Sequence, residues 1–73
     1  MIEVKFKDRL KELRKVNHLL QRELAEKIKV SVYVVSDWEK GRSEPCLQDL
    51  INLAVALNTT IDFLVGKDDI EIN

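Results

Sequence analysis

This 73-residue chain has few of the residues from which catalytic and metal sites are built. It has one cysteine, Cys46, and one histidine, His18, so the sequence contains neither an internal disulfide nor a Cys/His cluster with zinc spacing. Only two glycines occur, and no glycine-rich phosphate loop is present. These absences leave nothing from which to assemble an active centre, so we expect no enzymatic activity, metal, cofactor or small-molecule ligand.

Long apolar runs are absent as well. No run approaches the length of a membrane span, and the first ten residues alternate apolar and charged side chains, unlike a signal peptide. With 45% hydrophobic and 34% charged residues, the chain has the composition of a globular protein. We expect a cytoplasmic protein that forms one domain over residues 1–73, with His18 in solvent and Cys46 packed as a small apolar residue.

The charges are unevenly distributed, although the net charge is only −1. Residues 1–42 carry 11 Lys and Arg against 7 Asp and Glu, whereas residues 43–73 carry 1 against 6. A domain polarised in this way can turn its basic half toward phosphate groups. An ordinary mixed surface remains the alternative when charge is considered alone.

Apolar residues recur at helical spacing through most of the chain, which predicts an all-α fold. We expect five short helices with a compact core over 6–66: the first over about 5–17, the second and third in a helix-turn-helix over about 21–40, a fourth that starts near residue 45, and a fifth over 61–65. Ser31 and Thr60 are predicted N-caps, Gly41 and Gly66 are predicted helix stops, and Pro45 suits the first turn of the fourth helix. The predicted buried faces are Phe6, Leu10, Leu13 and Val16; Leu20, Leu24, Ala25 and Ile28; Val35 and Trp38; and Leu47, Leu50, Ile51, Ala54 and Leu57.

The two ends of the chain follow a different pattern. Ile2, Val4 and Phe6 alternate with charged residues, and so do Ile70 and Ile72. Alternation with period two is typical of strands, so the ends are predicted to pair as short strands, within one chain or between two chains. Frayed tails are the alternative.

The segment 21–41, QRELAEKIKVSVYVVSDWEKG, is the most informative part of the sequence. It predicts a short helix, a tight turn, a second helix that starts at Ser31, and then a basic loop that begins GRSEP. The segment resembles the helix-turn-helix of the phage repressor, Cro and xenobiotic-response-element (XRE) regulator family. The residues in register with that family are Gln21, Ala25, Val35, Trp38, Glu39 and Gly41. The resemblance extends from about residue 6 to residue 66.

The resemblance implies how such a chain meets double-stranded DNA. A major groove admits one helix, whose N-terminal half reaches the base edges. The outward residues of the third helix are Val32, Tyr33, Ser36 and Asp37, and we expect these to contact bases. By resemblance, Ser31, Val32, Tyr33 and Asp37 occupy the base-reading positions of the family. The expected backbone contacts are Gln21, Ser31, Lys40 and Arg42.

The base-reading positions depart from the usual polar set of this family. Val32 has no polar atom and can only touch a thymine methyl, whereas Asp37 can only accept and so favours a cytosine amino group. We therefore expect half-sites that are rich in thymine and contain cytosine. The alternative interpretation is that the apolar run from Val32 to Val34 is a patch for a protein partner.

Two further expectations come from the family. Arg14 and Glu39 match a pair that forms a salt bridge between the first and third helices, so we expect a structural role for both. Lys29 occupies a turn position that is often glycine in the family; if its φ is positive, lysine there costs on the order of 1 kcal/mol relative to glycine.

We expect a sequence-specific transcriptional regulator, most simply a repressor that acts as a homodimer. The apolar candidates for dimer contacts are Phe63, Val65, Ile70 and Ile72. The alternative is a protein-interaction module of the same fold, such as an antitoxin or an anti-repressor.

Overall fold

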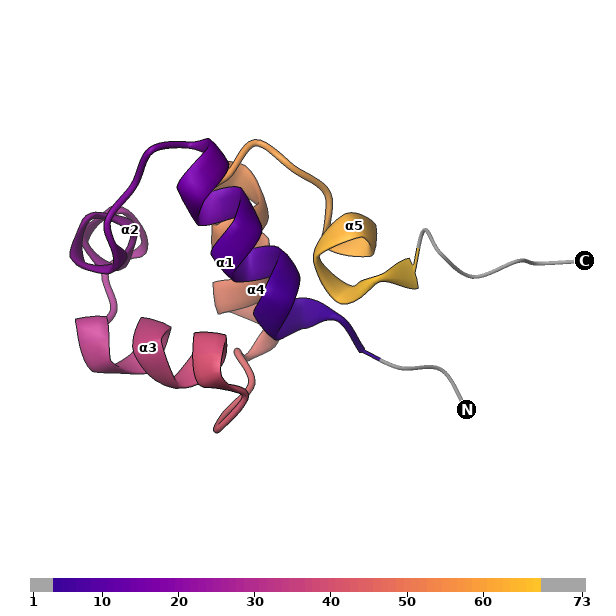
Figure 1. Ribbon diagram of the computed structural model, residues 1–73, viewed down its shortest axis with the longest axis horizontal. Coiled ribbons are helices and arrows are strands. Elements are labelled where there is room, and N and C mark those ends of the chain that lie inside the picture. The colour runs from indigo at the N-terminus through magenta and orange to yellow at the C-terminus, as the bar shows by residue number, and fades with distance from the viewer. Residues whose placement is uncertain (1–3, 68–73) are drawn as a thin grey trace, which may run out of the picture.

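Five helices make up the fold that the computed structural model describes, which covers residues 4–67 (Figure 1). They are α1 (Phe6–Val16), α2 (Gln21–Ile28), α3 (Val32–Lys40), α4 (Leu47–Ala56) and α5 (Ile61–Val65). No strand occurs among these residues. The predicted all-α fold is confirmed; α5 has its predicted bounds, and α1 is one residue shorter than predicted at each end.

A single apolar core joins the helices. α1 packs against α3 and α5, α2 packs against α3 and α4, and α4 also contacts α5. Figure 1 shows α2 and α3 together on the left of the molecule and α5 on the right. Phe6 and Trp38 meet edge to face, with ring centroids 6.5 Å apart, so the start of α1 is fixed to the end of α3. The buried apolar residues are Phe6, Leu10, Leu24, Ala25, Ile28, Val35, Trp38, Leu53, Ala54, Leu57 and Leu64.

Side-chain caps begin two of the helices, as predicted. The Ser31 hydroxyl accepts from the backbone N–H of Tyr33 at 3.1 Å, and the Thr60 hydroxyl accepts from that of Phe63 at 3.1 Å. The prediction for Pro45 is wrong, because α4 begins two residues later. Cys46 is the N-cap of α4 in an extended conformation, and its carbonyl accepts from Leu50 N–H at 3.0 Å.

Left-handed residues terminate all five helices. Gly41 and Gly66 do so after α3 and α5, as predicted, and Lys29 does so after α2 with φ 60°. His18 (φ 58°) follows α1 and Asn58 (φ 53°) follows α4. At the ends of α1, α2, α3 and α4, the residue that follows the left-handed residue donates its N–H to the carbonyl five positions earlier, at 2.9 to 3.0 Å. This is the Schellman arrangement, which gives the last carbonyls of a helix their partners.

Several residues predicted to be buried are exposed. Val16 is 65% exposed because it lies slightly more than a quarter of a turn from the centre of the face defined by Phe6 and Leu10. Leu20 is 51% exposed because it is the N-cap of α2 rather than part of its buried face. The three other wrong predictions are Leu47, Ile51 and Cys46, all exposed on α4 or at its start. The buried face of α4 is centred instead on Leu53, Ala54 and Leu57.

Most of the strand prediction for the two ends lies outside the described residues, Ile70 and Ile72 included. Within them, Val4 and Lys5 are not in a strand, but Lys5 donates its N–H to the carbonyl of Val65 at 3.2 Å. The chain entering α1 is therefore held against the end of α5. In the described part of the chain, no helix is both long and apolar enough to cross a membrane.

Candidate nucleic-acid interface

α3 has one buried face and one face open to solvent. Val35 and Trp38 point into the core, with 0% and 2% of their surface exposed. Tyr33 is 79% exposed, and Ser36 and Asp37 are partly exposed. These three predicted base-contact residues therefore lie on the part of α3 that a groove can reach.

Val32 differs from the other predicted base-contact residues. It is partly buried and packs against the core, as Val34 does. Only part of its side chain is left to touch a thymine methyl. The apolar run from Val32 to Val34 is therefore not a continuous exposed patch, since Tyr33 alone of the three is fully open to solvent.

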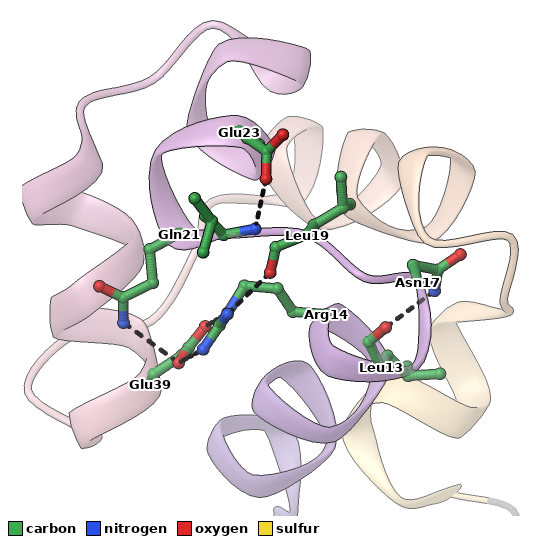
Figure 2. Close-up of polar contacts among 8 residues, drawn as sticks. Leu13, Arg14, Asn17, Leu19, Gln21, Glu23 and Glu39 are labelled. Carbon is green, nitrogen blue, oxygen red and sulfur yellow. Dashed lines mark hydrogen bonds and ion pairs between the residues drawn. The ribbon is translucent and has the colours of Figure 1, made fainter.

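The ion pair expected between Arg14 and Glu39 is present and largely buried, and Figure 2 shows the groups converging on the Glu39 carboxylate. Arg14 donates from Nε to Oε2 at 2.6 Å and from Nη2 to Oε1 at 3.0 Å. Its Nη1 donates to the carbonyl of Leu19 at 2.8 Å, so one guanidinium joins α1, α3 and the α1–α2 connection. The side chains of Arg14 and Glu39 are 12% and 2% exposed. The pair therefore fixes where α3 lies on the bundle.

Gln21 also donates to Glu39, from Nε2 to Oε1 at 3.2 Å. The third carboxylate contact thus comes from the first residue of α2. One amide hydrogen and the amide oxygen of Gln21 remain for a ligand. This bond joins the start of α2 to the end of α3 (Figure 2).

The first turn of α2 has backbone N–H groups with no side-chain cap. Leu20 is the N-cap residue and has no side-chain acceptor, unlike Ser31 at the start of α3. The Glu23 carboxylate instead accepts from the N–H of Leu20 itself at 2.8 Å, which is half of a capping box. Uncapped amides at the start of a helix attract anions such as phosphate.

The loop after α3 carries Lys40 and Arg42, both exposed. Arg42 Nη1 lies 3.9 Å from Asp37 Oδ1, with side chains 67% and 47% exposed. A predicted backbone contact therefore lies beside a predicted base contact. Such an exposed pair contributes little to stability, but it draws Arg42 toward the outward face of α3.

The predicted dimer residues that are described lie on α5. Phe63 and Val65 are both partly buried. Arg9 stacks over the Phe63 ring at 4.2 Å and donates to its carbonyl at 2.7 Å. Ile70 and Ile72 lie outside the described residues.

One surface feature was not predicted. Leu47, Ile51 and Val55 are 72%, 40% and 77% exposed and follow each other at intervals of four along α4. They form an apolar stripe, which we call the α4 stripe. The spacing of Leu47 and Ile51 is visible in the sequence, but helical spacing alone does not distinguish a helix buried on one broad face from a helix with two apolar faces.

Five helices around one core, with the second and third joined by a tight turn and the third open along one side, define the repressor-like class of helix-turn-helix domains. The helix-turn-helix family model matches residues 10–64. The chain belongs to this family, and the predicted resemblance to phage repressor, Cro and XRE regulators is confirmed.

Relatives of known name agree with this assignment. The transcriptional activator BcrR of Enterococcus faecalis is 31% identical over 67 residues, which are 92% of this chain and 33% of BcrR. The phage repressor RstR of Vibrio cholerae is 33% identical over 64 residues, 88% of this chain and 57% of RstR. The chain thus spans a third to under two thirds of these relatives. The P22 c2 repressor, crystallised with a synthetic operator, is 30% identical with a TM-score of 0.80, covering 82% of this chain and 91% of the repressor.

Proposed function

We propose that this chain binds double-stranded DNA sequence-selectively as a transcriptional regulator, most simply as a repressor that acts as a homodimer. In the proposed complex α3 enters the major groove with its N-terminal half against the base edges. The observation that carries the proposal is the two-sided character of α3. Tyr33 is 79% exposed, while Val35 and Trp38 are buried and hold the helix against the core.

The proposed base contacts are Val32, Tyr33, Ser36 and Asp37. The Tyr33 ring can lie on a thymine methyl while its hydroxyl reaches a base or a phosphate, and Ser36 can donate or accept. Asp37 only accepts, which favours the amino group of cytosine. The partly exposed Val32 adds apolar contact at the start of the helix. We expect half-sites rich in thymine that contain cytosine.

The proposed backbone contacts flank α3 on both sides. On one side, Gln21 and the uncapped amides of α2 meet a phosphate, and the bond from Gln21 to Glu39 holds the side chain ready. On the other side, the exposed cations Lys40 and Arg42 meet the second strand. Ser31 is the N-cap of α3, and its side chain is the proposed contact with the DNA backbone at the start of that helix.

Selection of bound duplexes from a random pool tests the proposal directly. The expected result is a two-fold symmetric site whose half-sites carry thymine and cytosine at the positions facing α3. Failure to retain any duplex, even at low salt, would overturn the proposal.

The backbone contacts are tested separately with Arg42→Ala. Loss of one phosphate contact should weaken binding to all sequences alike and reduce the salt slope by about 0.9. Lys27→Ala is the matched control, because Lys27 is exposed on α2 beside α4 and away from the loop after α3. A loss confined to the selected sequence, with an unchanged slope, would assign Arg42 to base reading instead.

A second candidate function is protein interaction by the same fold, as in an antitoxin or an anti-repressor. The observation that favours it is the α4 stripe, since neighbouring exposed apolar side chains are typical of protein contacts. Salt-dependent duplex binding separates the two candidates. A protein that binds no duplex but pairs with another chain through α4 would support the second.

A further inference from the structure

A shallow cavity of about 360 Å³ lies between the start of α1 and the loop that joins α3 to α4. Its apolar lining includes Phe6 and Trp38, which also belong to the core. Its polar lining includes three cations, Lys7, Lys40 and Arg42. The cavity therefore places a lysine of α1 in one surface with the two cations proposed to contact the DNA backbone.

Lys7 approaches the loop closely because Gly41 has no side chain. A Cβ placed on Gly41 would lie 3.0 Å from Cδ of Lys7 and 3.8 Å from its Nζ. The Lys7 stem thus lies along the loop backbone, and its ammonium group stands beside the residue between Lys40 and Arg42. A lysine that rests its stem on the surface and keeps its charge in water is well placed to meet an anion.

The charge around this cavity favours an anionic ligand. Three cations and one carboxylate, that of Glu44, belong to its lining. Asp37 is a further acidic neighbour, since its carboxylate lies 3.9 Å from Arg42. Among these five groups of the described residues, three cations face two carboxylates, so positive charge is in excess.

We propose that Lys7 is a third cation of the backbone contact, holding a phosphodiester of its own on the strand that Lys40 and Arg42 also meet. The inference rests on the proposed function, because the loop after α3 meets a strand only when α3 is in the groove. It extends the contact surface to α1, whose other end is tied to α3 through Arg14. A duplex strand that passes the loop then meets cations from two separate elements.

The test is the salt dependence of duplex binding, measured from about 50 to 200 mM salt. Lys7→Met keeps most of the stem and removes the charge, so the slope of log affinity against log salt should fall by about 0.9. Lys7→Arg should keep the slope. Lys27→Met is the matched control, since Lys27 is also exposed and lines a separate hollow between α2 and α4. Lys27→Met removes one positive charge, as Lys7→Met does, but it should change the slope of log affinity against log salt much less than Lys7→Met.

Equal slopes for wild type and Lys7→Met would overturn the inference while leaving the proposed function intact. Equal losses for Lys7→Met and Lys27→Met would also overturn it, because they would mean that only net charge matters. If Lys7→Met disturbs the fold, as judged by the fluorescence of Trp38, Lys7→Gln and Lys7→Arg carry the comparison. A wild-type protein that binds no duplex would end both proposals together.

Discussion

The turn between α2 and α3 contains a lysine in a conformation that suits glycine. Lys29 has φ 60° and ψ 46°, and a non-glycine residue there costs on the order of 1 kcal/mol. Lys29→Gly should therefore raise the free energy of unfolding by about 1 kcal/mol, which raises Tm by roughly 4–8 °C in a domain of this size. Thermal unfolding followed by circular dichroism measures the change.

Asn58→Gly is the control for this prediction. Asn58 has nearly the same conformation, with φ 53°, but asparagine tolerates the left-handed region better than lysine does. The increase in the free energy of unfolding should be clearly smaller for Asn58→Gly than for Lys29→Gly. Equal gains at both positions would mean that strain specific to lysine is not the cause.

The exposed pair of Asp37 and Arg42 leads to a prediction about selectivity. Asp37→Asn should leave stability almost unchanged, because an exposed pair at 3.9 Å contributes little. Affinity for a scrambled duplex should rise roughly two- to fivefold, since a charge that repels phosphate is removed and Arg42 is released. The preference for cytosine should fall, because an amide no longer acts only as an acceptor. Titrations of the selected and the scrambled duplex at one salt concentration measure both effects.

Asp62→Asn is a matched change on α5. Asp62 lies 3.8 Å from Lys67 in a similarly exposed pair, with side chains 62% and 55% exposed. We expect it to leave the preference for cytosine unchanged. Retained cytosine preference in Asp37→Asn would remove Asp37 from the base contacts.

At the scale of the elements, the position of α3 depends on one buried carboxylate. Glu39 accepts from Arg14 of α1 and Gln21 of α2 while its side chain is only 2% exposed. Glu39→Ala should lower the free energy of unfolding by about 3–5 kcal/mol, because it leaves Arg14 buried and unpaired. That is a large share of the stability of a small domain, so DNA binding should be lost through unfolding. Urea unfolding followed by Trp38 fluorescence measures the loss.

Glu26→Ala removes the same charge from an exposed position of α2 and should have little effect. The decisive outcome is the state of the Glu39→Ala protein. If it is fully folded and yet unable to bind, Glu39 contributes to recognition itself rather than to the position of α3.

The elements differ in how far the sequence specifies them. Ser31, Thr60, Gly41 and Gly66 mark their helix boundaries correctly, because caps and stops depend on local hydrogen bonds and backbone geometry. The wrong predictions of burial on α4 concern positions whose environment is set by neighbouring helices. Leu47 and Ile51 are apolar and correctly spaced, yet α4 turns its other face to the core.

The candidate interface shows the same division. The exposure of Tyr33 and the burial of Trp38 follow from helical period alone. The approach of Lys7 to Gly41 does not, because 34 positions of chain separate the two residues and only the packing of α1 on α3 brings them together. The bond between Gln21 and Glu39 is likewise a consequence of packing.

For the molecule as a whole, the main consequence of the proposal is that two copies act on one site. A single α3 of nine residues reaches only a few base pairs, so selectivity requires a second half-site. The half-sites of such proteins lie about 10–10.5 base pairs apart, centre to centre, so that both helices enter grooves on one side of the duplex. α5 carries Phe63 and Val65 at the end of the molecule away from α2, where a second copy can pack without blocking α3.

This arrangement predicts a strong dependence on spacing. Binding to two half-sites about one helical turn apart should be cooperative, with two chains per duplex. Insertion of about half a turn puts the second site on the opposite side of the duplex, so the cooperative gain should disappear while each half-site still binds weakly. Insertion of a full turn returns the second half-site to the same side of the duplex but moves the two α5 surfaces apart. Cooperativity should therefore stay low if α5 makes the contact between the two chains. Titrations of the three duplexes measure the cooperativity, and sedimentation gives the number of chains per duplex. Equal affinities at all three spacings would mean that the chains bind independently.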